Sequence, residues 1–140
     1  MKPTRLFLDT AFVQALLNKN DQYHGIAKSR LNELRTAKEV WITEAILIEI
    51  GNALSVAHRA AAVRFINQCY ATSNIHVAPV DTKLLNRALD LYDERADKEW
   101  GLTDCISFIV MSDQNLTEAM TPDRHFIQAG FQALMRDQSA

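Results

Sequence analysis

The sequence predicts an α/β protein with three layers, α/β/α, around a central, mostly parallel sheet of four to five strands. Two patterns in the 140-residue chain support this prediction. The short apolar run RLFL at Arg5–Leu8 is typical of a buried parallel strand. The segment after it has apolar residues at helical spacing, as Phe12 and Leu16 show. Repetition of this strand–helix unit favours a parallel sheet with helices on both faces.

The same alternation continues along the chain. We expect the strands at residues 5–8, 40–42, 75–80, 116–120 and 131–135. We expect the helices at residues 11–17, 25–35, 44–57, 59–70 and 83–94, then a buried helix within residues 100–111 and a helical turn at 124–129. Asp81 and Thr103 are residue types that cap helix N-termini, and we place them at the starts of two of these helices. Gly130 suits the position after the last helical turn.

Composition is that of an ordinary globular chain. We expect one domain over residues 1–140, with a core from about 5 to 135 and a frayed tail at 136–140. The net charge of −2 gives no support for a broad basic surface, so a nucleic-acid partner would need local Lys/Arg patches or a metal bridge. Cys69 and Cys105 sit in apolar helical contexts, which fits a reducing cytoplasm. The sequence shows no secretory signal and no apolar run of membrane-spanning length.

Four acidic residues occupy distinctive positions. Asp9, Asp104 and Asp123 each fall where a strand or a loop meets the next element. Taken alone, Asp9 and Asp104 can each be explained as a helix-capping residue. Glu49 lies in the middle of a helix, between two isoleucines, where capping offers no explanation. Asn52 follows on the same side of that helix, within reach of Glu49.

Right-handed crossovers would bring the carboxyl ends of the strands, and with them all four acids, to one edge of the sheet. Carboxylates in one place repel each other, and their pKa values rise unless a cation neutralises them. Of the residues directly beside these four acids, only Arg124 is a Lys or Arg. A hard divalent ion, Mg²⁺ or Mn²⁺, is therefore the expected cofactor. His125, two residues after Asp123, is more simply interpreted as structural than as a substrate contact.

The stretches that carry these acids resemble the four acidic motifs of PIN-domain ribonucleases. They are LFLDT at 6–10, ILIEIGNAL at 46–54, LTDCISF at 102–108 and TPDRHF at 121–126. Their order and spacing agree with the family, and the resemblance runs from Arg5 to about Leu134. It is nearest to small bacterial PIN proteins, including VapC-like toxins of toxin–antitoxin pairs.

The resemblance implies a metal-dependent endoribonuclease. Asp9, Glu49, Asp104 and Asp123 would be its catalytic, metal-binding acids. The residues Thr10, Asn52 and Thr103 would orient carboxylates or water around them. RNA would be the substrate and a cognate antitoxin the protein partner. A homodimer is also expected, because segments such as residues 60–66 are apolar beyond a single stripe.

Other interpretations remain open at this stage. A PIN fold without catalytic activity, binding RNA or a protein, is the main alternative, and DNA could replace RNA as substrate. A response-regulator receiver is disfavoured, because it needs an acidic pair near the first strand and a late Lys. A haloacid-dehalogenase-type phosphatase needs DxD after the first strand, whereas this chain has Asp9-Thr10-Ala11.

Overall fold

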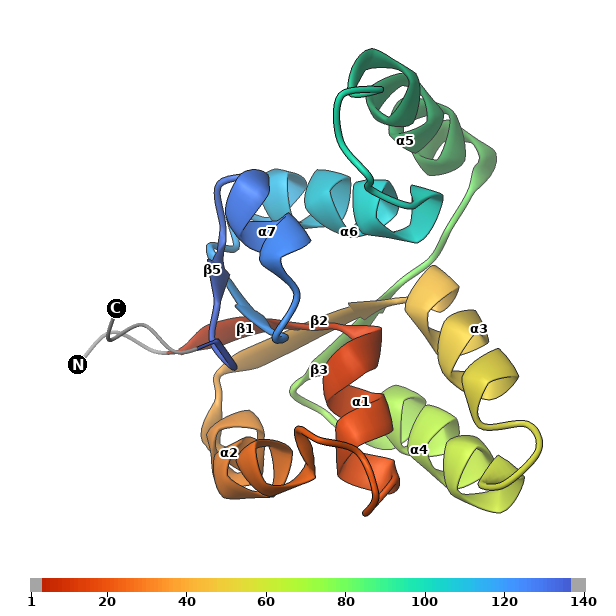
Figure 1. The fold of residues 1–140 in the computed structure, drawn as a ribbon, viewed down its shortest axis with the longest axis vertical. Helices are drawn as coiled ribbons and strands as arrows, with labels where there is room; N and C mark the ends of the chain where they lie inside the picture. The colour runs from red at the N-terminus through yellow and green to blue at the C-terminus, as the bar shows by residue number, and fades with distance from the viewer. Residues whose placement is uncertain (1–3, 137–140) are drawn as a thin grey trace.

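A five-stranded parallel sheet forms the centre of the computed structural model, which describes residues 4–136 (Figure 1). The strands are β1 (Arg5–Leu8), β2 (Glu39–Thr43), β3 (Ile75–Ala78), β4 (Glu118–Met120) and β5 (Gln132–Ala133). Their order is β3-β2-β1-β4-β5, and every neighbouring pair is parallel. The predicted α/β class and all five predicted strands are confirmed, and the sheet is parallel throughout.

Helices cover both faces of the sheet. They are α1 (Thr10–Leu17), α2 (His24–Thr36), α3 (Glu44–Ala53), α4 (Arg59–Ala71), α5 (Thr82–Glu94), α6 (Leu102–Asp113) and α7 (Arg124–Gln128). In Figure 1, α1, α2 and α4 lie on one side of the sheet and α6 and α7 on the other. Alternation of side chains along β1 explains these layers, because Phe7 packs against Phe126 of α7 while Leu8 faces α1 and α4. In the described part of the chain, no helix is both long and apolar enough to cross a membrane.

Helix α3 is shorter than expected. It ends at Ala53 and a turn follows, whereas the sequence pattern predicts a helix to residue 57. The Ser55 hydroxyl donates to the Asn52 carbonyl at 2.9 Å, and the Ser55 N–H lies 3.5 Å from the same carbonyl, three residues back instead of four. Small polar side chains compete in this way with the helical hydrogen bonds of the backbone. The prediction was wrong here because an apolar stripe continues past the point where the backbone bonds change.

Strand order locates the ligand-binding edge. Strands β2 and β3 lie on one side of β1, and strands β4 and β5 lie on its other side. In open α/β sheets, ligands bind at the carboxyl ends of the strands, where the order reverses. Asp9 directly follows β1 and Thr121 directly follows β4, so both residues lie at this point.

Candidate metal centre

Asp9 points across the sheet instead of capping its own helix. It stands at the N-cap position of α1, but its side chain makes no capping hydrogen bond. Its Oδ2 accepts a hydrogen bond from the Thr121 hydroxyl at 2.8 Å, and only 7 % of the residue is exposed. The capping interpretation of Asp9 therefore does not account for this buried carboxylate.

Thr121 connects two of the acids. Besides donating to Asp9, its fully buried hydroxyl accepts the backbone N–H of Asp123 at 3.1 Å. Asp123 in turn caps α7, because its Oδ1 accepts the His125 N–H at 2.8 Å. Sequence reasoning missed Thr121, although a Thr two residues before an Asp is typical of a hydroxyl-stabilised turn.

Asp104 lies in the first turn of α6, facing α7. The N-cap of this helix is Gly101, so the prediction that Thr103 caps it was wrong. The helix begins earlier because Asp104 Oδ2 accepts the Gly101 N–H at 3.2 Å, one half of a capping box. Thr103 contributes its carbonyl, which accepts the Ser107 hydroxyl at 3.1 Å.

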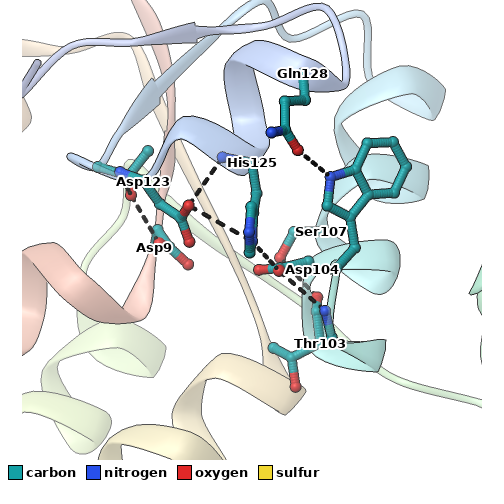
Figure 2. Close-up of polar contacts among 10 residues, drawn as sticks. Asp9, Thr103, Asp104, Ser107, Asp123, His125 and Gln128 are labelled. Carbon is teal, nitrogen blue, oxygen red and sulfur yellow. Dashed lines mark hydrogen bonds and ion pairs between the residues drawn. The ribbon is translucent and has the colours of Figure 1, made fainter. Parts of the chain in front are cut away.

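His125 lies between two of the carboxylates, as Figure 2 shows. Its Nδ1 is 3.0 Å from Asp104 Oδ2 and 3.6 Å from Asp123 Oδ1. Each of these three residues can offer one ligand atom, and the three atoms lie within 4.8 Å of one another. Carboxylate and imidazole groups are donors that Mn²⁺ accepts, while Mg²⁺ prefers the carboxylate oxygens.

Glu49 reaches the same edge from α3. Its Oε1 accepts the hydroxyl of Thr10 at 2.6 Å, and Thr10 is the residue next to Asp9. Among the described residues, the group whose ligand atoms lie together is Asp104, Asp123 and His125, and it includes neither Asp9 nor Glu49. Asp9 is near enough to Asp104 and Asp123 for their charges to act on it, whereas Glu49 is joined only to Asp9, through Thr10. Asn52 is exposed, and within residues 4–136 its side chain forms no hydrogen bond with Glu49.

Electrostatics at this edge favour a cation. Burial raises the pKa of Asp9 to about 7, and the charges of Asp104 and Asp123 add to the rise against the lowering effect of the Thr121 hydrogen bond. Burial also raises the pKa of Asp104, with the His125 hydrogen bond opposing it. Within the described chain, the basic side chain that contacts these acids is that of His125, whose Nδ1 faces Asp104 and Asp123. The donor set and the unbalanced negative charge therefore fit a divalent metal ion.

Comparison with known proteins found no matching protein-family model and no matching curated protein. Solved structures do match. VapC20 of Mycobacterium tuberculosis, described as a sarcin-ricin loop cleaving toxin, superposes with a TM-score of 0.80 and 27 % identity, over 90 % of this chain and 95 % of that chain.

Two more distant structures support the fold alone. VapBC2 of Rickettsia felis, solved on a DNA fragment from its promoter, has a TM-score of 0.65 and 15 % identity, over 93 % of this chain and 96 % of that one. FitAcB of Neisseria gonorrhoeae has a TM-score of 0.60 and 15 % identity, over 91 % of this chain and 94 % of that one.

Proposed function

This chain is a VapC-like PIN-domain protein, and from that premise we propose that it is an endoribonuclease that uses Mg²⁺ or Mn²⁺ to hydrolyse RNA phosphodiester bonds. The observation that carries the proposal is the convergence of Asp9, Asp104 and Asp123 at the point where the strand order reverses. The similarity to VapC20, a toxin described as cleaving the sarcin-ricin loop, supports RNA as the substrate.

We assign the metal-binding and catalytic roles to Asp9, Glu49, Asp104 and Asp123. A bound divalent ion would lower the pKa of the attacking water and polarise the phosphoryl oxygen. The chain's own contribution is to hold the carboxylates in place before the ion arrives. Thr121 fixes Asp9 and the turn that bears Asp123, and Thr10 fixes Glu49. Such prior orientation of ligands strengthens metal binding.

Metal removal tests this proposal. Purified protein should cut a fluorescent single-stranded RNA in Mn²⁺ or Mg²⁺ and should lose that activity in excess EDTA, because the proposed ion both activates the attacking water and polarises the phosphoryl oxygen. Gel analysis of the products measures the cleavage rate with metal and the rate in EDTA. Equal cleavage in EDTA would exclude a metallonuclease. RNA binding without cleavage in either metal would favour a non-catalytic binding module with a PIN fold. Cleavage of DNA but not of RNA would show that DNA is the substrate.

An apolar cavity supports our proposal of an antitoxin-like protein partner. It measures about 440 Å³ and lies between α1, α2 and α4, with Phe12, Leu31 and Phe65 among its apolar lining and Arg35 and Arg64 also lining it. The similarity to VapC20, which is described as a toxin, agrees with such a partner. An amphipathic segment with acidic residues would suit this lining.

Replacing the exposed Arg64 with Glu reverses the charge that this segment would meet. The variant should therefore co-purify less with the product of a neighbouring small reading frame. Unchanged co-purification would show that the partner binds elsewhere on the protein.

We also propose a homodimer. Its interface would be on α5 and not on residues 60–66, the segment expected from the sequence. On α4, Val63 is 54 % exposed, but Phe65 and Ile66 are partly buried against the core. Helix α5 instead exposes Leu85, Leu89 and Tyr92, at 40 %, 50 % and 48 %, on one helical face. Light scattering should give a dimer for the wild type and a monomer for Leu89→Lys; a monomeric wild type at high concentration would contradict the proposal.

We also propose that the protein is cytoplasmic. Cys69 and Cys105 are both buried free thiols, which agrees with a reducing compartment.

A further inference from the structure

His125 places one ring nitrogen between two of the acids. Its Nδ1 lies 3.0 Å from Asp104 Oδ2 and 3.6 Å from Asp123 Oδ1 (Figure 2). A hydrogen bond to Asp104 explains the shorter distance, but it does not by itself account for a second carboxylate facing the same nitrogen. Two carboxylates and a ring nitrogen gathered around one point are the arrangement that a shared cation makes favourable.

The distances are those of neighbouring ligands on one ion. In an octahedral site with ligands about 2.1 Å from the metal, adjacent ligand atoms lie about 3 Å apart and opposite ones about 4.2 Å apart. Both distances from His125 Nδ1 fall in this range. A neutral imidazole that carries its proton on Nε2 would leave the Nδ1 lone pair for the ion.

Both carboxylates keep one oxygen for the ion. Asp104 Oδ2 accepts the Gly101 N–H, and Asp123 Oδ1 accepts the His125 N–H. Within residues 4–136, Asp104 Oδ1 and Asp123 Oδ2 accept no hydrogen bond. The local hydrogen bonds therefore orient both side chains while one oxygen of each remains available as a ligand.

The backbone that carries His125 is held firmly. Its N–H donates to Asp123 Oδ1 at 2.8 Å, and the next residue, Phe126, is fully buried beside Phe7 and Phe108. The His125 side chain is partly buried, with 21 % of it exposed. The imidazole is therefore positioned before an ion arrives, which strengthens metal binding.

A small polar cavity gives water and ions access to His125. It measures about 250 Å³ and lies between α7 and the loop that joins α5 to α6. Besides His125 and Gln128, its lining has two acids and two bases, which are Asp97, Glu99, Lys98 and Arg124. These four charges sum to zero, so the cavity adds no net charge to the metal centre.

An imidazole ligand changes which ion a site prefers. Mg²⁺ prefers oxygen ligands and gives up its water reluctantly, so a nitrogen ligand adds little to its binding. Manganese accepts both kinds of donor, as the carboxylate–histidine sites of helical bundle proteins show. Building on the metal site of the ribonuclease proposed above, we propose that His125 Nδ1 is a direct metal ligand beside Asp104 and Asp123, and that the site therefore selects Mn²⁺ over Mg²⁺.

Electron paramagnetic resonance of Mn²⁺ bound to the full chain tests direct ligation. Wild-type protein with one equivalent of Mn²⁺ should show spin-echo modulation from a directly bound nitrogen nucleus. Protein made with nitrogen-15 histidine should show the nitrogen-15 pattern instead, which assigns the signal to a histidine. Titration of the free Mn²⁺ signal, with and without Mg²⁺ as competitor, measures both affinities, and Mn²⁺ should bind more tightly.

His125→Asn distinguishes a ligand from a positioning residue. The Asn amide NH₂ can donate to Asp104 as an imidazole Nδ1–H would, so a role in orienting Asp104 alone would survive this change. A ligand role would not, and the modulation from a directly bound nitrogen should disappear. Loss of a partner outside the ligand shell already costs 10–100-fold in metal affinity, so Mn²⁺ affinity should fall by roughly tenfold or more. Mg²⁺ affinity should fall much less.

His76→Asn is the matched control. It makes the same chemical change on an exposed residue of β3 that stacks on Trp41 and lies outside the group of Asp104, Asp123 and His125. This variant should keep the modulation and both affinities, and metal-free melting checks that each variant folds. A wild type without bound Mn²⁺, bound Mn²⁺ without histidine modulation, or an unchanged Mn²⁺-to-Mg²⁺ affinity ratio in His125→Asn would overturn the inference. The wild-type spectrum can do so without any variant.

Cleavage of single-stranded RNA by the same samples separates this inference from the proposed function. Metal-dependent cleavage without histidine modulation would refute the histidine ligand and leave the ribonuclease intact. Histidine modulation that His125→Asn abolishes, without cleavage of any RNA, would support the histidine ligand and refute the ribonuclease.

Discussion

Asp104→Asn is expected to lower metal-dependent RNA cleavage by about 100-fold or more while leaving the fold intact. Asn has nearly the same size, and its carbonyl oxygen can still accept the Gly101 N–H that Asp104 Oδ2 accepts at 3.2 Å. The first turn of α6 therefore keeps its hydrogen bond. What is lost is a negative charge beside Asp123 and His125, where the proposed ion is held. Single-turnover cleavage in Mn²⁺ and metal-free thermal melting measure the two effects separately.

Asp81→Asn provides the matched control. Asp81 caps α5 by accepting the Leu84 N–H at 2.8 Å, and it is exposed. Asn is an equally good capping residue, so this variant should fold normally and cut RNA at the wild-type rate. Wild-type cleavage by Asp104→Asn would show that Asp104 does not hold a catalytic ion, and the assignment of the four acids would then be wrong.

Asp9→Asn is expected to change how stability depends on pH in the absence of metal. Burial raises the pKa of Asp9 from 3.8 to about 7 in the folded protein. Below the lower value both states carry the proton, so the carboxyl favours neither state. As pH rises toward the higher value, the unfolded state releases the proton first, and the free energy of unfolding falls. The difference of roughly three pH units corresponds to about 4 kcal/mol lost above about pH 7.

Urea unfolding of both proteins in EDTA checks this expectation. The wild type should lose stability relative to Asp9→Asn between about pH 4 and about pH 7, while the titration of the other carboxylates largely cancels in the comparison. Adding Mn²⁺ at neutral pH should restore stability to the wild type more than to the variant, because an ion that binds only the folded state stabilises it. Parallel pH profiles for the two proteins would mean that Asp9 is not a destabilised buried carboxylate.

Local sequence determined the elements of this protein and the positions of its acids. An apolar run such as Arg5–Leu8, or a capping residue such as Asp81, acts through neighbours a few residues away, so its effect can be predicted from the sequence. The positions of Asp9 and Asp123 at the ends of strands follow in the same way, because the strand boundaries are local. The strand–helix pattern also predicted that Glu49 and Asp104 lie at the same edge, and the resemblance to PIN domains then implied a shared metal-binding role for the four acids.

Only the tertiary structure decided how these acids are held and what lies beside them. The bond from Thr121 to Asp9 joins residues 112 positions apart, and it exists because β4 pairs with β1. The contact of His125 with Asp104 depends likewise on how α7 lies against α6. Likewise, the exposed face of α5 and the cavity beside His125 result from which helices pack together. These features depend on strand order and helix packing. Sequence patterns that span only a few residues do not specify either, so these features could not be predicted from the sequence alone.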